Sequence, residues 1–228
     1  MIIEEREIEI ETLTGLRIGG EKETFEVGGL DNPVIRIVYD KEKKVPIIPG
    51  SSLKGRMSML LEKEYGIEYE NGNPSAKYQS ITSDEKLKDI AERTHELFRS
   101  TNGVKLIFSD LLPTKETLEM WDELEKKEFT YDKGTETKVE NVINRESGTS
   151  ANLRKMERVV RGSKFKGVVT LVYDNEAEKN EKMKKDIEIL EKGLELISKT
   201  YIGGCGSRGY GRVRIKFNGK TFAPSHIE

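Results

Sequence analysis

The stretch FKGVVTLVYDNEAEKNEKMKKDIEILEKGLELISKTYIGGCGSRGYGRVRIKF, residues 165–217, decides the fold. Residues 165–173 are mostly β-branched and apolar, which predicts a strand. Apolar residues then recur every three or four positions and predict a long amphipathic helix. After a glycine-rich loop at 201–211, residues 212–217 alternate as a second strand, so the segment is a strand–helix–strand unit. The apolar helix positions are Met183, Ile187, Leu190, Leu194 and Ile197.

A similar unit precedes it. Residues 7–13 alternate apolar and charged side chains, which suits a half-buried strand. Residues 51–65 predict a helix that Ser51 or Ser52 caps, and residues 104–108 predict a strand. Two such units predict an α+β fold of the ferredoxin-like, RRM-like βαββαβ type. The aromatic RNA-binding signature of RRM modules is not visible, so any RNA binding would have to rest on other parts of the structure.

Two insertions enlarge this core within what we expect to be a single domain, 1–228. Residues 66–103 predict a helical insertion, with a helix from 83 to 98. Residues 128–162 are polar, charged and short of core residues. We therefore expect them to form a hairpin that projects from the body.

Composition restricts the class of protein. The chain has 228 residues, 35% of them charged, and a formal net charge of −2. No apolar run approaches the length of a membrane helix, and the acidic N-terminus does not resemble a secretory signal. Cys205 is the single cysteine and excludes an intrachain disulfide, so we expect a reducing cytoplasm. With two histidines, a structural zinc site is not expected.

Basic residues gather in two stretches of this nearly neutral chain. Residues 152–166 carry six basic side chains against one acidic, and residues 198–217 carry five against none. Such segregation can build a basic groove that attracts a polyanion. Ordinary scatter of surface charge explains the pattern equally well at this stage.

The glycine-rich loop carries the most specific chemical signal. Five of the nine residues from 203 to 211 are glycine, and glycine lets backbone N–H groups approach a phosphate closely. Arg208 lies inside the loop, where its guanidinium can pair with a phosphate. A helix C-cap followed by a tight turn explains Gly203 or Gly204. It does not explain Gly206, Gly209 and Gly211 together.

The second signal is PIIPGSSLKGRM, residues 46–57. Ser51 and Ser52 stand at a helix N-terminus, which favours an anion. Lys54 and Arg56 follow in the first turns, where the helix dipole disfavours cations unless an anion binds there. The glycines of a nucleotide-binding P-loop are missing. The alternative is a capped core helix with incidental charge.

These motifs, taken in order, resemble the RAMP superfamily and, within it, the backbone subunit (subunit three) of the type III-A CRISPR effector, the Csm complex. The resemblance covers both ends and the middle of the chain. The segments that carry it are TGLRIGG (14–20), GGLDNPV (28–34), PIIPGSSLKGRM (46–57), TKVENVINRESGTSANLRKMERVVRGSKF (137–165) and GGCGSRGYGRVRI (203–215).

The resemblance implies a subunit that stacks with copies of itself along a guide CRISPR RNA, beside other subunits of the Csm complex. It also implies a thumb hairpin, here 128–162, that inserts into the duplex of guide and target RNA. No membrane partner is implied. The predicted RNA-binding residues are Arg17, Ser51, Ser52, Lys54, Arg56, Arg145, Arg158, Arg161, Lys164, Gly204, Gly206, Arg208, Gly209 and Gly211.

The resemblance places target-RNA cleavage on Asp31, in a reaction that depends on a divalent metal, Mg²⁺ or Mn²⁺, and uses the ribose 2′-OH as nucleophile. A carboxylate in this position can act as a general base or as a metal ligand. Without the resemblance, Asp-Asn-Pro reads as an ordinary turn.

The sequence departs from many relatives at two places. Arg17 replaces a histidine, which excludes histidine acid–base chemistry there, and a cysteine cluster for zinc is missing, so no zinc is expected. Two alternatives to the nuclease remain. One is a purely structural RNA-binding filament subunit, and the other is a standalone enzyme that matures guide RNA, which the shortage of histidine disfavours.

Overall fold

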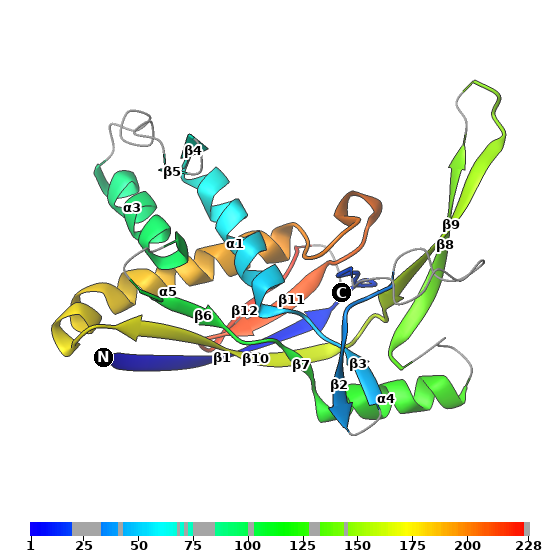
Figure 1. The fold of residues 1–228 in the computed structure, drawn as a ribbon, viewed down its shortest axis with the longest axis horizontal. Coiled ribbons are helices and arrows are strands. Elements are labelled where there is room, and N and C mark those ends of the chain that lie inside the picture. The colour runs from blue at the N-terminus through cyan, green and yellow to red at the C-terminus, as the bar shows by residue number, and fades with distance from the viewer. Residues whose placement is uncertain are drawn as a thin grey trace.

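The fold is seen in a computed structural model of the chain (Figure 1). Asp31 and Arg145, two of the predicted site residues, lie outside the residues that the structure describes. The described residues are 1–19, 33–40, 43–67, 69–70, 73–74, 85–99, 103–127, 133–143 and 146–225.

A six-stranded antiparallel sheet forms the centre of the molecule. Its strands are β1 (Ile2–Thr12), β6 (Leu106–Phe108), β7 (Leu112–Pro113), β10 (Lys164–Tyr173), β11 (Val213–Phe217) and β12 (Lys220–Phe222). They lie in the order β12-β11-β1-β10-β6, and β7 also pairs with β10. The four strands of the two units therefore stand as fourth, first, third and second, which is the ferredoxin-like arrangement and confirms the predicted fold class.

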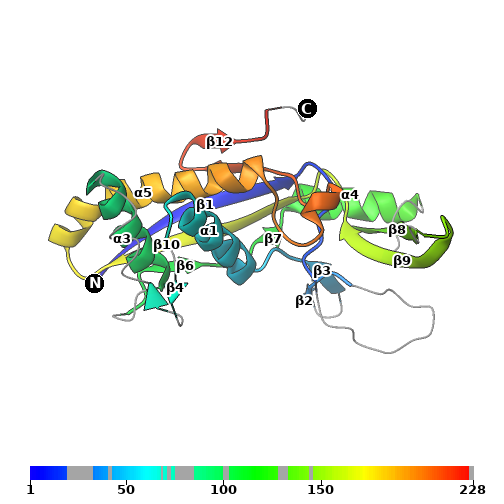
Figure 2. The same cartoon turned by 90° about the horizontal axis from the view of Figure 1, so that it is seen from above.

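Three helices cover one face of this sheet, as the two views in Figures 1 and 2 show. They are α1 (Gly50–Glu64), α3 (Glu85–Arg99) and α5 (Glu176–Lys199). Even-numbered residues of the inner half of β1 point toward these helices, because successive side chains of a strand alternate between its faces. None of the helices in the described part of the chain is long and apolar enough to cross a membrane. Buried residues between sheet and helices include Ile8, Ile10, Leu53, Met57, Leu61, Val169, Leu171, Leu190, Leu194 and Ile197.

A long hairpin projects from one end of the sheet (Figure 1). Its strands are β8 (Thr135–Ile143) and β9 (Ser150–Val159), within the polar segment 128–162. Its base is held to the core by the bridge between Leu16 and Val159. Helix α4 (Lys115–Lys126) packs below the base, where the Trp121 indole donates to the Ser163 hydroxyl at 2.9 Å.

Short elements complete the described fold. The pair β2 (Arg36–Asp40) and β3 (Lys43–Pro46) leads into α1, the pair β4 (Tyr69–Glu70) and β5 (Asn73–Pro74) follows it, and η1 (Gly206–Arg208) is a 3-10 turn in the glycine-rich loop.

The predicted capping of α1 by Ser51 or Ser52 is wrong. The N-cap residue is Pro49, and its side chain makes no capping hydrogen bond. The Asp110 carboxylate, from the loop between β6 and β7, instead accepts a hydrogen bond from the Gly50 N–H at 2.9 Å. A tertiary contact therefore takes the place of the local cap.

Helix α4 was not predicted, although its sequence contains a start signal. Thr114 is its N-cap and accepts a hydrogen bond from the Thr117 N–H. The strand β1 also begins at Ile2 rather than at residue 7, because its pairing with β10 continues to Tyr173.

Candidate nucleic-acid interface

The start of α1 and the glycine-rich loop lie side by side. Arg56 donates from Nε to the carbonyl oxygen of Tyr201 at 3.0 Å, and its guanidinium lies 4.1 Å from the centre of the Tyr201 ring. The same ring occupies the space beside Gly206, where a Cβ would come within 2.1 Å of it. Two stretches far apart in the sequence thus converge, which is the arrangement that a shared RNA site requires.

The N-terminus of α1 carries the partial positive charge of a helix dipole, and the Asp110 carboxylate already accepts from its first N–H. Ser51 is exposed and Ser52 half-buried, and the first turn carries no acidic side chain. Lys54 Nζ donates to the Leu106 carbonyl of β6 at 2.9 Å, and burial lowers the pKa of this ammonium group. Because an ammonium has three donors, this contact leaves others for a phosphate.

The glycines of the loop serve different purposes. Gly211 has φ of +71°, and a Cβ there would stand 2.0 Å from the Ile202 carbonyl oxygen. Packing within the chain therefore requires glycine at 211, as it does at Gly206. At Gly204, by contrast, φ is not in the left-handed region and the nearest atom to a Cβ is the flexible Arg17 guanidinium, at 3.1 Å. Gly204 is the loop glycine that the fold itself does not demand.

Two arginines converge on the Cys205 thiol. Arg17 Nη1 lies 3.5 Å and Arg208 Nη2 lies 2.7 Å from its Sγ. The Gly204 N–H donates to the Arg17 carbonyl at 2.7 Å, which ties the TGL segment to the loop. Within the described residues Arg17 Nε is buried without a hydrogen-bond partner. The loop therefore presents concentrated positive charge.

One face of the hairpin packs against this loop. Glu140 of β8 pairs with Arg208 Nη1 and accepts a hydrogen bond from the Tyr210 hydroxyl at 2.8 Å. Burial and the bond to Glu140 raise the pKa of Tyr210 to about 12. Lys138 and Arg158 lie over the same ring, at 4.8 and 5.1 Å. Sequence reasoning missed Glu140 and Tyr210, although the two-residue period of β8 places Glu140 on one face with Lys138.

The opposite face of the hairpin holds the segment that follows Asp31. Glu157 of β9 accepts a hydrogen bond from the Val34 N–H at 2.7 Å and pairs with Arg36 at 2.5 Å. Thr135 donates to the same carboxylate at 2.9 Å. Burial would raise the pKa of Glu157, but these bonds outweigh it and keep the pKa below its ordinary value.

Two other predicted RNA-binding residues stand at the junction of β9 and β10. Arg161 is exposed in the turn between β9 and β10. Lys164 begins β10, and its backbone pairs with Thr114 and Thr117 at the start of α4. A single short stretch of RNA at Arg208 would not need these two side chains.

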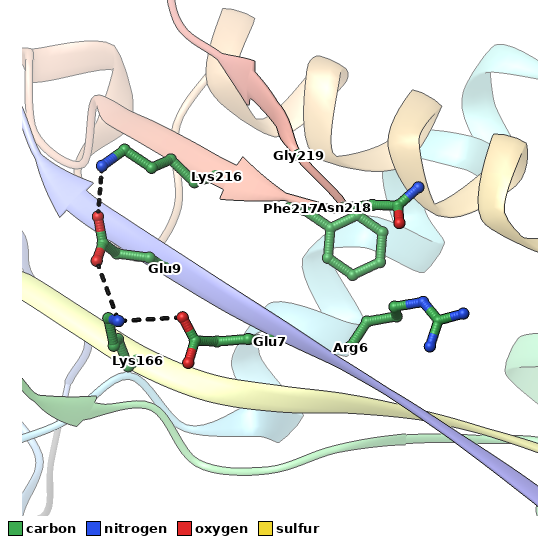
Figure 3. Close-up of a pocket in the computed structure, with 8 residues that line it drawn as sticks. All are labelled: Arg6, Glu7, Glu9, Lys166, Lys216, Phe217, Asn218 and Gly219. Carbon is green, nitrogen blue, oxygen red and sulfur yellow. Dashed lines mark hydrogen bonds and ion pairs between the residues drawn. The ribbon is translucent and has the colours of Figure 1, made fainter.

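A separate hollow of about 460 Å³ lies on the sheet beside the turn between β11 and β12 (Figure 3). Its charged side chains neutralise one another: Glu9 pairs with Lys216 at 3.0 Å and with Lys166 at 3.7 Å, and Lys166 also pairs with Glu7. Arg6, which also lines the hollow, pairs with Glu4 at 3.1 Å, so every cation around the hollow is already engaged by a carboxylate.

The fold and this interface define a ferredoxin-like α+β protein with a basic, glycine-rich loop. The sequence model of the RAMP superfamily matches residues 9–214, and the chain belongs to this superfamily, in the same family as the Csm3 proteins described next. "CRISPR system Cms endoribonuclease Csm3" of Methanocaldococcus jannaschii is 39% identical over 91% of this chain and 76% of that protein. The proteins of the same name from Methanothermobacter thermautotrophicus and Streptococcus thermophilus are 37% and 34% identical, covering 91% and 89% of this chain and 81% and 82% of theirs.

Solved structures share the fold. A chain of the apo type III-B Cmr-beta complex superposes with a TM-score of 0.59 at 12% identity, covering 94% of this chain and 97% of that one. The crystal structure of Methanopyrus kandleri Csm3 gives 0.50 at 24% identity, covering 95% and 76%. At these identities the likeness concerns the fold alone.

Proposed function

We propose that this chain is the repeated backbone subunit of a Csm effector complex, in which it binds the guide RNA and cleaves the target RNA paired to it. The observation that carries the proposal is sequence similarity: relatives between 34% and 39% identical, over 89% to 91% of this chain, are named as Csm3 endoribonucleases. Copies of the chain would stack along the guide beside the other Csm subunits.

The guide would be held through its phosphates. The side chains of Lys54, Arg56 and Arg208 supply donors from two converging stretches. The remaining predicted RNA-binding residues would extend this grip along the strand. Because phosphate contacts carry no base information, binding should vary little with the RNA sequence.

Cleavage would rest on Asp31. The ribose 2′-OH attacks the adjacent phosphate and expels the 5′-oxygen of the next nucleotide, while the Asp31 carboxylate accepts the 2′-OH proton or holds the metal ion. A divalent ion such as Mg²⁺ would stabilise charge on the phosphate when bound. One carboxylate, with phosphate oxygens and water, is a donor set that suits Mg²⁺. Among the described residues no three His, Cys, Asp or Glu side chains gather as a metal cluster.

The test is target cleavage by the reconstituted complex with Asp31→Ala. We expect cleavage to be abolished while guide RNA is retained. Asp89→Ala is the matched control, because Asp89 is an exposed acid that pairs with Lys185 on the helical face. Equal cleavage by the wild type and Asp31→Ala would remove the catalytic role of Asp31, and a wild-type complex that binds target RNA without cleaving it would leave a purely structural RNA-binding subunit. Removal of metal with EDTA, followed by Mg²⁺ or Mn²⁺, tests the metal requirement separately.

A further inference from the structure

Glu140 occupies a position that the predicted RNA contacts do not explain. Its side chain is 13% exposed and that of its partner Arg208 is 45% exposed. One carboxylate oxygen accepts from the buried Tyr210 hydroxyl at 2.8 Å, and the other faces the Arg208 guanidinium. Glu140 thus connects a residue of the core, a strand of the hairpin and the exposed arginine of the loop.

We propose that Glu140 is a positioning residue that holds Arg208 ready for an RNA phosphate and so couples the hairpin to the phosphate-binding loop. The proposal rests on the function proposed above. It assigns Glu140 no contact with RNA.

The geometry of the guanidinium supports this role. Arginine has five N–H donors in a rigid planar fork. Arg208 donates from Nη1 to the Glu140 carboxylate and from Nη2 to the Cys205 sulfur, and these two bonds fix the orientation of the guanidinium. The remaining N–H groups are left for a phosphate. A long side chain that is already ordered loses less conformational entropy when it binds.

The electrostatics distinguish Glu140 from a simple competitor for Arg208. Burial would raise the pKa of Glu140, but the Tyr210 hydroxyl and the charges of Arg208 and Lys138 outweigh it and lower the pKa. The carboxylate therefore stays ionised, and the charges of Arg208 and Lys138 balance it. With Arg17, Lys138 and Arg158 nearby, the site remains attractive to a phosphate.

The coupling follows from where Glu140 stands. It lies on β8, opposite Arg154 of β9, so a change in the direction of the hairpin would move the carboxylate and release Arg208. Occupation of the loop by RNA would, conversely, favour the hairpin orientation seen here.

The experiment compares Glu140→Gln, Arg208→Ala and the double variant in the full chain, using fluorescein-labelled oligouridine RNA and fluorescence anisotropy over a range of salt concentrations. Gln keeps an acceptor for Tyr210 but loses the charge that orients Arg208. Glu64→Gln is the matched control, because it removes one negative charge from a carboxylate that pairs with Lys192 at the end of α1. Thermal melting reports on stability alone.

We expect Glu140→Gln and Arg208→Ala each to weaken binding by about fivefold, and the double variant to be no weaker than either. Both should also make the negative slope of log affinity against log salt less steep by about 0.7, the value of one phosphate contact on a single strand. A merely structural role would change the melting temperature without changing this slope.

Tighter binding with a steeper slope in Glu140→Gln would show that Glu140 competes with RNA, and would overturn the proposal. Additive losses in the double variant, or binding equal to that of Glu64→Gln, would overturn it as well. If Arg208→Ala leaves affinity and slope unchanged while the wild type binds RNA, Arg208 does not contact the RNA. The positioning role of Glu140 is then overturned. If the wild type binds no RNA, the proposed function itself fails.

Discussion

The hairpin carries two carboxylate–arginine pairs, one on each face, and they differ in burial. Glu157 is 2% exposed and its partner Arg36 is 14% exposed, whereas Arg208, the partner of Glu140, is 45% exposed. Every oxygen of Glu157 is engaged by the protein, through Val34, Arg36 and Thr135. Glu140 holds an arginine whose outer side faces solvent.

The difference separates a structural pair from a pair suited to binding. Removing one partner of a buried ion pair leaves an uncompensated charge, whereas an exposed pair contributes little to stability. The buried pair thus fixes the hairpin to the segment after Asp31. The open pair leaves a cation accessible to a ligand.

The largest expected effect on stability comes from the buried pair of Glu157 and Arg36. Glu157→Ala would remove the carboxylate that pairs with Arg36 and that accepts from the Val34 N–H, and we expect it to lower the free energy of unfolding by about 3–5 kcal/mol. Urea denaturation followed by circular dichroism measures this. A loss below about 1 kcal/mol, as for an exposed pair, would remove the distinction between the two faces.

The next effect concerns the rigid part of the glycine-rich loop. Gly211→Ala would place a Cβ against the Ile202 carbonyl at a positive φ. We expect a loss of about 2–3 kcal/mol in the same assay. Unchanged stability would mean that the loop relaxes easily, and that Gly211 is there for RNA rather than for packing.

A smaller effect, the pH dependence of stability, tests the buried pair of Glu157 and Arg36 in a second way. Because the pKa of Glu157 is lowered in the folded state, its contribution is complete above the unfolded value, about 4.3, and disappears as pH falls through the folded value. The difference between the wild type and Glu157→Gln, about 1–2 kcal/mol at pH 7, should therefore shrink toward pH 3. A difference that stays constant over this range would contradict the assignment.

The smallest expected effect on stability is at Gly204. Gly204→Ala meets only a flexible guanidinium, so the free energy of unfolding should change by less than about 0.5 kcal/mol. RNA binding should weaken, because the added Cβ stands where a phosphate would approach the backbone. Wild-type affinity in the anisotropy assay would place the phosphate elsewhere.

Much of the fold followed from patterns of apolar residues. The helices at α1, α3 and α5 were predicted from periodicity, because burial of one face forces a spacing of about 3.6, and the strand at β10 was predicted from its β-branched and apolar residues. Helix α4 was missed, although Thr114 is a typical N-cap residue and Trp121 is an apolar residue on the buried face of the helix. The candidate site was predicted less completely, because the roles of Glu140 and Tyr210 depend on a contact between residues 70 positions apart in the chain.

By itself the sequence determined the fold class, the position of the hairpin and the loop that bears Arg208, because these depend on local periodicity and on glycine content. Tertiary structure alone decided which glycines serve packing and which leave room for a ligand, and that Asp110 rather than a serine meets the first N–H of α1. It also decided that Glu157 forms a buried structural pair, whereas Glu140 on the same hairpin pairs with an exposed arginine. Burial and partner choice depend on where distant segments meet, and no local pattern encodes that meeting.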